Sequence, residues 1–159
     1  MVPKANFGRS YNVFTIDKAT GATTYKSYDV FGLLSKASDM ATYLNSLPST
    51  VIVVIATYDE PSTTNNNTGY TQQSINATTP VDNSAFITAM KRCGAPSNFG
   101  NPANFFYRSV YVLVGTPGMG TGKGLERYSG ADNSGTGDPA AVIDLTIKFV
   151  SGQYTYVSG

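Results

Sequence analysis

Residues 49–61 have the sequence S-T-V-I-V-V-I-A-T-Y-D-E-P. Residues 51–56 form an unbroken apolar run rich in β-branched side chains, which are stiff and pack well on a pleated surface. The run is too short for a buried helix, and it lies between two prolines, Pro48 before it and Pro61 after it. It therefore predicts a central strand over residues 51–57 that is covered on both faces.

Polarity rises abruptly at the end of this strand, where Tyr58, Asp59 and Glu60 follow one another. Loops at the carboxyl end of a central strand often hold ligands, and they equally often turn into solvent. These three side chains are therefore candidate contacts to a ligand or a partner.

Composition excludes several classes of function. Only 13% of the 159 residues are charged, and the net charge is +1 without any run of Lys or Arg, which argues against nucleic acid as a partner. The chain has no His, and Cys93 is its single cysteine. It therefore cannot build the usual zinc site, a Ser–His or Cys–His catalytic pair, or an internal disulfide. We expect no catalytic residues, no cofactor and no metal.

The amino terminus, Met-Val-Pro-Lys-Ala-Asn, lacks the apolar segment of a signal peptide. No apolar stretch approaches the roughly 18 residues that a transmembrane helix needs. We therefore expect synthesis in the cytoplasm and no membrane insertion. The length suits a single domain over residues 1–159, with a core over 7–150 and a terminal hairpin strand over 151–159.

The first third of the chain predicts a hairpin followed by a helix. Residues 10–17 alternate between apolar and polar side chains, and residues 23–28 supply the returning strand, with Gly21 providing the positive φ of the turn. From residue 35 the apolar period changes to about 3.6, which is typical of an amphipathic helix. Pro48 ends this helix, so we expect it over residues 35–47.

The middle of the chain predicts a long loop and a second helix. Residues 62–80 are rich in Thr, Asn and Gln, and such loops are either binding loops or disordered insertions. Asp82 or Asn83 then caps a helix over residues 82–93, which buries Phe86, Ile87, Met90 and Cys93. Cys93 is accordingly interpreted as a small core residue rather than a reactive thiol.

The last third predicts strands separated by a glycine-rich segment. Residues 105–114 form a strongly apolar strand in which Arg108 is the one charge, and residues 116–139 are expected to be an extended surface excursion. Residues 140–150 alternate as a half-buried strand, and residues 153–157 return from it as a hairpin. The predicted core residues are Leu44, Val53, Ile55, Phe86, Met90 and Val112.

Two motifs in the glycine-rich segment are excluded as ligand sites. Residues 118–124 resemble a phosphate-binding loop, but Pro117 stands where the motif needs glycine and Gly124 where it needs Ser or Thr. Residues 132–138 resemble a calcium loop, but the distal bidentate Glu is missing. We therefore expect neither nucleotide binding nor calcium binding.

Six segments occur in a distinctive order: GRSYNV at 8–13, DKATG at 17–21, SYD at 27–29 with FG at 31–32, LNSLP at 44–48, VIVVIATYDE at 51–60 and FYRSVYVLVG at 106–115. Together they resemble the interleukin-like EMT inducer domain, also called the GG domain. The family includes secreted cytokine-like proteins, the stem of a protein O-mannose N-acetylglucosaminyltransferase, which binds glycan, cell-surface hyaluronan-degrading proteins, and long tail fibres of T-even-like bacteriophages. The resemblance implies an α+β fold, with two packed, mainly antiparallel, sandwich-like β-sheets, two flanking helices and long surface loops. It implies no catalytic centre.

The chain differs from the vertebrate branch of that family. It lacks the disulfide cysteines and the secretory signal, and it has Phe31 and Val110 or Tyr111 where tryptophans are usual. It also carries long insertions at residues 62–80 and 116–139. A cysteine-poor chain rich in Thr, Asn, Gly and Tyr suits a virion protein, which is made in a reducing cytoplasm and works outside it.

Two hypotheses for the function follow. The first is a non-enzymatic structural or attachment module of a bacteriophage tail, tail fibre or baseplate, whose partners are other virion proteins or further copies of itself. The alternative is a carbohydrate-binding module for host glycans, with an exposed aromatic platform near Tyr58, Tyr70 or Tyr107. The candidate contact residues are Tyr58, Asp59, Glu60, Tyr70, Tyr107, Arg108, Lys123, Tyr154 and Tyr156.

Overall fold

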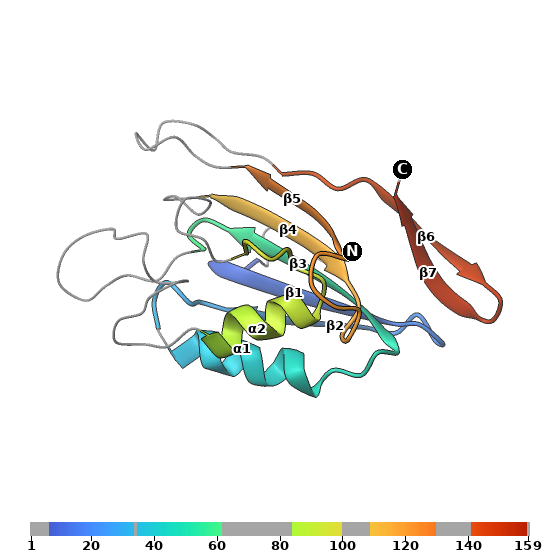
Figure 1. Cartoon of the computed structure of the whole chain (residues 1–159), viewed down its shortest axis with the longest axis horizontal. Helices are drawn as coiled ribbons and strands as arrows, with labels where there is room; N and C mark the ends of the chain where they lie inside the picture. The colour runs from blue at the N-terminus through green and yellow to red at the C-terminus, as the bar shows by residue number, and fades with distance from the viewer. Residues whose placement is uncertain (1–6, 34, 62–83, 100–108, 130–140, 159) are drawn as a thin grey trace.

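The computed structural model describes residues 7–33, 35–61, 84–99, 109–129 and 141–158 (Figure 1). These residues form two helices and two antiparallel sheets, which confirms the expected α+β class. The elements are β1 (Ser10–Asp17), β2 (Thr23–Tyr28), α1 (Ser35–Ser46), β3 (Val51–Tyr58), α2 (Ser84–Arg92), β4 (Val110–Gly115), β5 (Leu125–Ser129), β6 (Leu145–Val150) and β7 (Gln153–Ser158).

The larger sheet has the strand order β2-β1-β3-β4-β5, so β3 is central, as its apolar sequence predicts. All its neighbouring strands are antiparallel. In β1 and β3, Val13 lies opposite Ile55 and faces the helices, whereas Phe14 lies opposite Val54 and faces the other side.

The β1–β2 hairpin forms where the sequence predicts it. The Asp17 side chain accepts hydrogen bonds from the backbone N–H groups of Ala19 and Thr20, at 3.0 and 2.8 Å. Gly21 has a φ of +72°, a left-handed conformation that glycine adopts without steric strain. The side chain of Asp17 and the backbone of Gly21 thus set the turn.

The two helices pack side by side across one face of this sheet and enclose the core (Figure 1). The Arg92 guanidinium at the end of α2 donates to the carbonyl oxygens of Leu44 and Leu47, at 2.9 and 3.2 Å. These carbonyls belong to the last turn of α1 and the segment after it, where the helix no longer supplies a full set of donors. Arg92 therefore ties the ends of the two helices together.

The predicted core is confirmed for Leu44, Val53, Ile55, Phe86 and Met90, which are all buried. The prediction for Val112 is wrong, because this residue is only half-buried. Its neighbours Tyr111 and Leu113 face the helices instead. The β3–β4 register decides this, since Leu113 lies opposite Ile55 and Val112 lies opposite Ala56.

The glycine-rich segment contains a strand that the sequence analysis missed. Residues 116–139 were expected to be a surface excursion, yet β5 pairs with β4 in register, Val112 with Arg127 and Val114 with Leu125. Gly118, Gly120 and Gly122 all have positive φ, so the chain reverses between the two strands. The prediction of strand over residues 105–114 is confirmed from Val110 onward, and residues 105–108 lie outside the described residues.

The terminal hairpin β6–β7 forms a separate two-stranded sheet beyond the end of the larger one (Figure 1). The strand expected over residues 140–150 begins only at Leu145. The expectation that it is half-buried is wrong at its end, because Phe149 is 59% and Val150 49% exposed. No second layer covers these side chains within the described part of the chain. The loop at residues 62–80 and the cap residues Asp82 and Asn83 lie outside the described residues.

Candidate binding groove and terminal hairpin

The three candidate contacts at the end of β3 have different environments. Tyr58 is 44% exposed, whereas Glu60 is only 1% exposed. The Ser10 hydroxyl donates to the Glu60 carbonyl oxygen at 2.5 Å and accepts from the Phe31 N–H at 3.1 Å. Asp59, with a φ of +62°, turns the chain between them. Glu60 is therefore held inside the fold, which leaves Tyr58 and the half-buried Asp59 as surface candidates.

The turn that carries Lys123 is tied down through its backbone. The N–H groups of Gly118, Gly122 and Gly124 donate to the carbonyls of Arg92, Ala95 and Gly94, at 2.9, 2.8 and 3.0 Å. A phosphate-binding loop needs such N–H groups directed at the ligand. These three N–H groups are instead directed at the chain after α2, and Lys123 is an exposed cation on this turn.

The remaining candidates do not join these residues in one site. Tyr154 and Tyr156 lie on β7, in the separate hairpin, and the Tyr154 ring lies 5.0 Å from the Phe149 ring between centroids. Burial raises the pKa of Tyr156. Tyr70, Tyr107 and Arg108 lie outside the described residues. The described candidates thus occupy the end of β3, the β4–β5 turn and the terminal hairpin.

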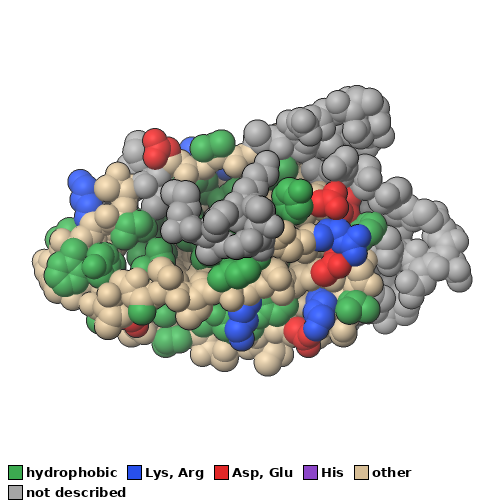
Figure 2. Space-filling view, turned by 180° about the vertical axis from the view of Figure 1, so that it is seen from behind, with side chains coloured by type: hydrophobic (Ala, Val, Ile, Leu, Met, Phe, Trp, Pro, Cys, Tyr) green, Lys and Arg blue, Asp and Glu red, His purple; other side chains and the backbone are tan. Residues whose placement is uncertain are grey.

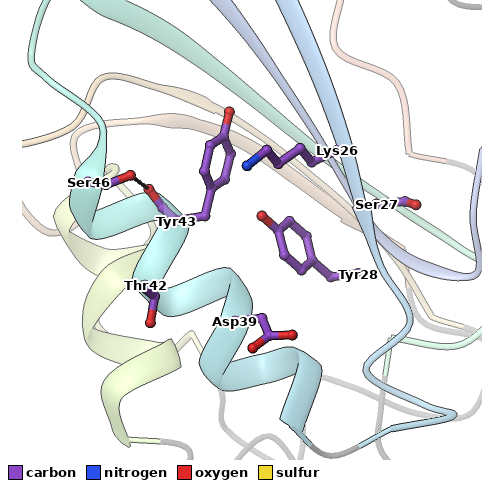
Figure 3. Close-up of a pocket in the computed structure, with 7 residues that line it drawn as sticks. All are labelled: Lys26, Ser27, Tyr28, Asp39, Thr42, Tyr43 and Ser46. Carbon is purple, nitrogen blue, oxygen red and sulfur yellow. Dashed lines mark hydrogen bonds between the residues drawn. The ribbon is translucent and has the colours of Figure 1, made fainter.

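A groove of about 590 Å³ lies between the edge strand β2 and helix α1 (Figure 3). Strand β2 and helix α1 contribute aromatic rings, hydroxyls and two charged groups. The lining residues are Lys26, Ser27, Tyr28, Asp39, Thr42, Tyr43 and Ser46. None of them was among the contacts that the sequence analysis selected.

Tyr43 is the centre of this groove. The Lys26 ammonium lies 4.1 Å from the centroid of its ring, within the range of a cation–π contact. The Tyr43 and Thr24 hydroxyls are 3.2 Å apart, and the Tyr28 ring centroid is 6.1 Å from that of Tyr43. Figure 3 shows Lys26, Tyr28 and Tyr43 directed toward one another across the groove. These contacts hold the half-buried Tyr43 ring in place in the wall of the groove.

The two charged groups that line the groove, Lys26 and Asp39, have opposite signs. Asp39 is paired with Lys36 at 2.7 Å, so its charge is partly balanced on the helix surface. Burial, together with the nearby Tyr43 and Asp39, raises the pKa of Tyr28 to about 12, so its hydroxyl keeps its proton at neutral pH. Aromatic rings beside hydroxyl groups suit a polar ligand with an apolar face.

The sequence does contain a signal for this groove. Asp39, Thr42, Tyr43 and Ser46 recur at helical spacing and share one face of α1, beside the apolar stripe that is buried in the core. This spacing alone could not predict the groove, because only the fold places Tyr28 and Lys26 of β2 opposite that face.

Cys93 lies in the core of the fold. Cys93 is fully buried, which confirms its interpretation as a core residue, and burial raises the pKa of its thiol to about 11. Among the described residues, no group of three His, Cys, Asp or Glu side chains could hold a metal ion. No helix in that part of the chain is long and apolar enough to span a membrane.

A comparison with known families gives a match that covers the groove but not the terminal hairpin. Residues 9–80 match the family model described as interleukin-like EMT inducer. The resemblance inferred from the sequence is confirmed. The interleukin-like EMT inducer match includes β1, β2, α1 and β3, and therefore both walls of the groove. The terminal hairpin lies outside it. A search of curated proteins finds no match to this chain.

Proposed function

We propose that the protein is a non-enzymatic docking module of a bacteriophage virion, working through protein–protein contact in the tail, tail fibre or baseplate. The observation that supports docking is that the terminal hairpin exposes two large apolar side chains, Phe149 and Val150, to solvent. The two residues are consecutive on β6, so each face of the hairpin exposes one of them. A partner that covers this hairpin would remove them from water.

The assignment to a virion rests on the sequence. The chain combines low charge with abundant Thr, Asn, Gly and Tyr, has no His, and contains one cysteine, which is buried. Such a chain folds in the host cytoplasm without disulfides and keeps its fold outside the cell. The proposal also rests on the resemblance described in the sequence analysis, because the family that the sequence resembles includes long tail fibres of T-even-like bacteriophages.

Purified phage particles provide the test of this proposal. Mass spectrometry of particles washed in high salt should detect the chain in a fixed ratio to the other tail proteins. A variant that ends after Asp144, and so lacks the hairpin, should be expressed and folded but no longer incorporated. Absence of the full-length chain from the particles would refute the virion assignment. Normal incorporation of the shortened chain would refute docking through the hairpin.

The groove between β2 and α1 supports carbohydrate binding as a second candidate function. Sugars present apolar ring faces together with hydroxyls, and the groove offers the Tyr28 and Tyr43 rings beside the hydroxyls of Thr42 and Ser46. In this case the ligand would be a host surface glycan. Recognition would then use the groove rather than Tyr58, Tyr70 or Tyr107.

Binding to a panel of neutral host-surface oligosaccharides tests the second candidate. Tyr43→Ala should weaken binding by about tenfold or more, because it removes the ring on which a sugar face would stack. Tyr128→Ala is the control, since Tyr128 is a tyrosine exposed on β5, at the opposite edge of the sheet. Equal effects of the two substitutions, or no binding to any oligosaccharide, would contradict a glycan site in the groove.

A further inference from the structure

Strand β2 is an open edge of the larger sheet. It pairs with β1 on one side and has no neighbouring strand on the other within the described residues. The Asp17 N–H donates to the Ala22 carbonyl oxygen at 2.8 Å, so residue 22 belongs to a hydrogen-bonded pair of the β1–β2 hairpin. Because such pairs alternate along an antiparallel ladder, the backbone groups of Thr23, Tyr25 and Ser27 point away from β1. The edge therefore presents alternating donors and acceptors on its outer side.

The terminal hairpin meets this region at the turn before β2. The Tyr154 N–H donates to the Lys18 carbonyl oxygen at 2.5 Å, and the Tyr154 ring lies over Gly21, where an added Cβ would come within 2.8 Å of Cε2. Both contacts involve residues of the turn rather than residues of β2. In the described structure, the outer side of β2 is thus left to another partner.

The groove between β2 and α1 follows this open edge. Ser27 is one of its lining residues, although Figure 3 shows the Ser27 side chain directed away from Lys26 and Tyr28. Ser27 therefore lines the groove through its backbone, which the ladder directs outward. Helix α1 supplies the facing wall, with Asp39 and Tyr43 among its residues. The groove is thus bounded by a strand edge on one side and by a helix on the other.

A groove of this kind fits an extended polypeptide. A peptide backbone carries donors and acceptors at the spacing of a strand, so it continues the ladder of β2 while its alternate side chains enter the groove. A sugar carries no donors and acceptors at that regular spacing. The exposed backbone of β2 therefore favours a polypeptide over a glycan as the occupant of the groove.

Lys26 makes the edge selective. It is the one charged residue of β2, and it forms no ion pair within the described part of the chain. A lysine on an edge strand disfavours pairing with indiscriminate apolar strands. A carboxylate directly opposite it is favourable, because opposite charges stabilise a cross-strand pair. Asp39, the other charge in the groove, is already paired with Lys36 at 2.7 Å, so Lys26 decides which charge the groove attracts.

The other face of β2 ends an aromatic row. The Tyr25 ring stacks on the Phe14 ring at 4.8 Å between centroids, and the Phe14 ring lies 5.5 Å from that of Phe7. Tyr25 is half-buried and lies on the outermost strand of the sheet. A β-branched or aromatic side chain opposite Tyr25 would extend this row.

We propose that β2 binds an acidic, extended segment of a partner protein as an added antiparallel strand. A carboxylate of that segment lies opposite Lys26 in the groove, and the residues on either side of it are β-branched or aromatic and lie on the Tyr25 face. Antiparallel addition continues the pattern of the sheet. The inference goes beyond docking through the terminal hairpin, because it uses a different edge of the molecule and does not depend on the virion assignment.

A labelled peptide tests the proposal with the whole chain. The probe Gly-Thr-Val-Glu-Val-Thr-Gly places its glutamate opposite Lys26 and its valines opposite Tyr25 and Ser27. We expect saturable binding in fluorescence anisotropy. Hydrogen exchange at the N–H groups of Thr23, Tyr25 and Ser27 should slow when the probe binds, because the added strand accepts hydrogen bonds from them. No binding, or binding without that protection, would overturn strand addition.

Two N-methylated forms of the probe separate backbone pairing from side-chain contact. In antiparallel pairing the valine N–H groups face β2, whereas those of the glutamate and the threonines face solvent. N-methylation of both valines should weaken binding by about tenfold or more, and N-methylation of the glutamate and the second threonine should leave it unchanged. Equal effects of the two forms would contradict pairing along the edge.

Charge reversal tests the selectivity. Lys26→Glu should weaken binding of the probe by about tenfold, and a probe with lysine in place of the glutamate should restore it. Arg127→Glu is the control, because Arg127 is an exposed cation on β5, the other edge strand of the sheet. The control should bind the original probe as the parent does. Equal losses in the two variants, or no recovery with the lysine probe, would contradict a carboxylate opposite Lys26.

This inference and the functions proposed above can fail separately. Binding of a neutral oligosaccharide in the groove, with no binding of the probe, would overturn the inference and favour the glycan candidate. Probe binding by a protein that is absent from phage particles would confirm the inference and refute the virion assignment. Circular dichroism of each variant distinguishes loss of the edge contact from loss of the fold.

Discussion

Strands β3 and β6 carry similar apolar side chains but lie in opposite environments. Ile55 of β3 is 0% exposed, because β1 and β4 flank the strand and both helices cover its face. Phe149 of β6 is 59% exposed, because its strand has β7 as its one neighbour and no layer above it among the described residues. The difference teaches that an apolar pattern decides which side chains share a face, whereas burial requires a second layer.

The face of the molecule seen in Figure 2 carries few charges. Figure 2 shows hydrophobic side chains interspersed with charged and polar ones, and few charges in all. Hydroxyl and amide groups therefore carry much of the solvation, in keeping with a charged fraction of 13%. In such a surface, apolar side chains on a protruding hairpin are available to a partner without strong charge repulsion.

The largest expected effect comes from truncating the buried strand. Ile55→Ala should lower the free energy of unfolding by about 2–5 kcal/mol, through lost burial and the cavity that remains. Phe149→Ala should lower it by less than about 0.5 kcal/mol in the monomer, because the ring is already in water. Urea unfolding at low protein concentration measures both. Similar losses for the two variants would mean that the hairpin is packed on the sheet.

The second largest loss of stability is expected at the contact between the end of β4 and the residue that follows α2. A Cβ on Gly115 would lie within bond-length range of the Cys93 carbonyl oxygen, which belongs to the backbone and cannot rotate away. Gly115→Ala should therefore destabilise the fold by about 1–3 kcal/mol or more, as overpacking does. Thermal unfolding of this variant beside the parent measures the loss, and an unchanged melting temperature would contradict the close packing of β4 on Cys93.

Removing the hairpin should have a smaller effect than either core change. Deletion of residues 145–159 removes one described backbone hydrogen bond and one ring contact from the larger sheet, so we expect a loss of at most about 1 kcal/mol. Differential scanning calorimetry should show nearly the parent melting temperature. A collapse of the fold would show instead that the hairpin is part of its core.

The smallest expected effect is the pH dependence of the Arg9–Asp29 pair. The Arg9 guanidinium donates to Asp29 at 2.7 and 2.9 Å and lowers the pKa of that carboxyl below its ordinary value of 3.8. The ion pair therefore contributes its full stabilisation when the pH is above the ordinary pKa of Asp29. This stabilisation is lost as the pH falls through the lowered pKa of the folded protein. Both side chains are 40% exposed, so it should amount to about 0.2–1 kcal/mol.

Urea unfolding of the parent and of Asp29→Asn, between neutral and acidic pH, isolates this contribution. The stability difference between the two should be largest at neutral pH and should disappear at acidic pH. A difference that stays constant over the whole range would show that Asp29 acts through its hydrogen bonds to the backbone rather than through its charge.

The sequence predicted those elements whose signals are local. The alternation in residues 10–17 and 23–28, the apolar run after Pro48 and the helical period after residue 35 each gave an element with its correct type and nearly correct ends. Strand β5 was missed because its signal is weak, since Leu125 and Tyr128 lie among glycines. Val112 was misplaced because the side chain that faces the helices depends on the register with β3.

The candidate site could be predicted only in part, for the same reason. The helical spacing of Asp39, Thr42, Tyr43 and Ser46 is visible in the sequence, whereas the opposing Lys26 and Tyr28 come from a strand that the fold brings beside it. Glu60 belongs to the polar sequence after β3, yet its neighbours in space bury it.

The sequence by itself determined the α+β fold class, the central strand and the two helices. It also determined the interleukin-like EMT inducer resemblance and the lack of His and of paired cysteines. These are properties of short segments or of composition, which need no knowledge of distant neighbours. Only the tertiary structure decided which apolar strands are buried, where the β2–α1 groove lies and that Tyr154 meets Gly21. Each of these depends on contacts between residues far apart in the chain, and local periodicity carries no information about which layer, if any, will cover a given face.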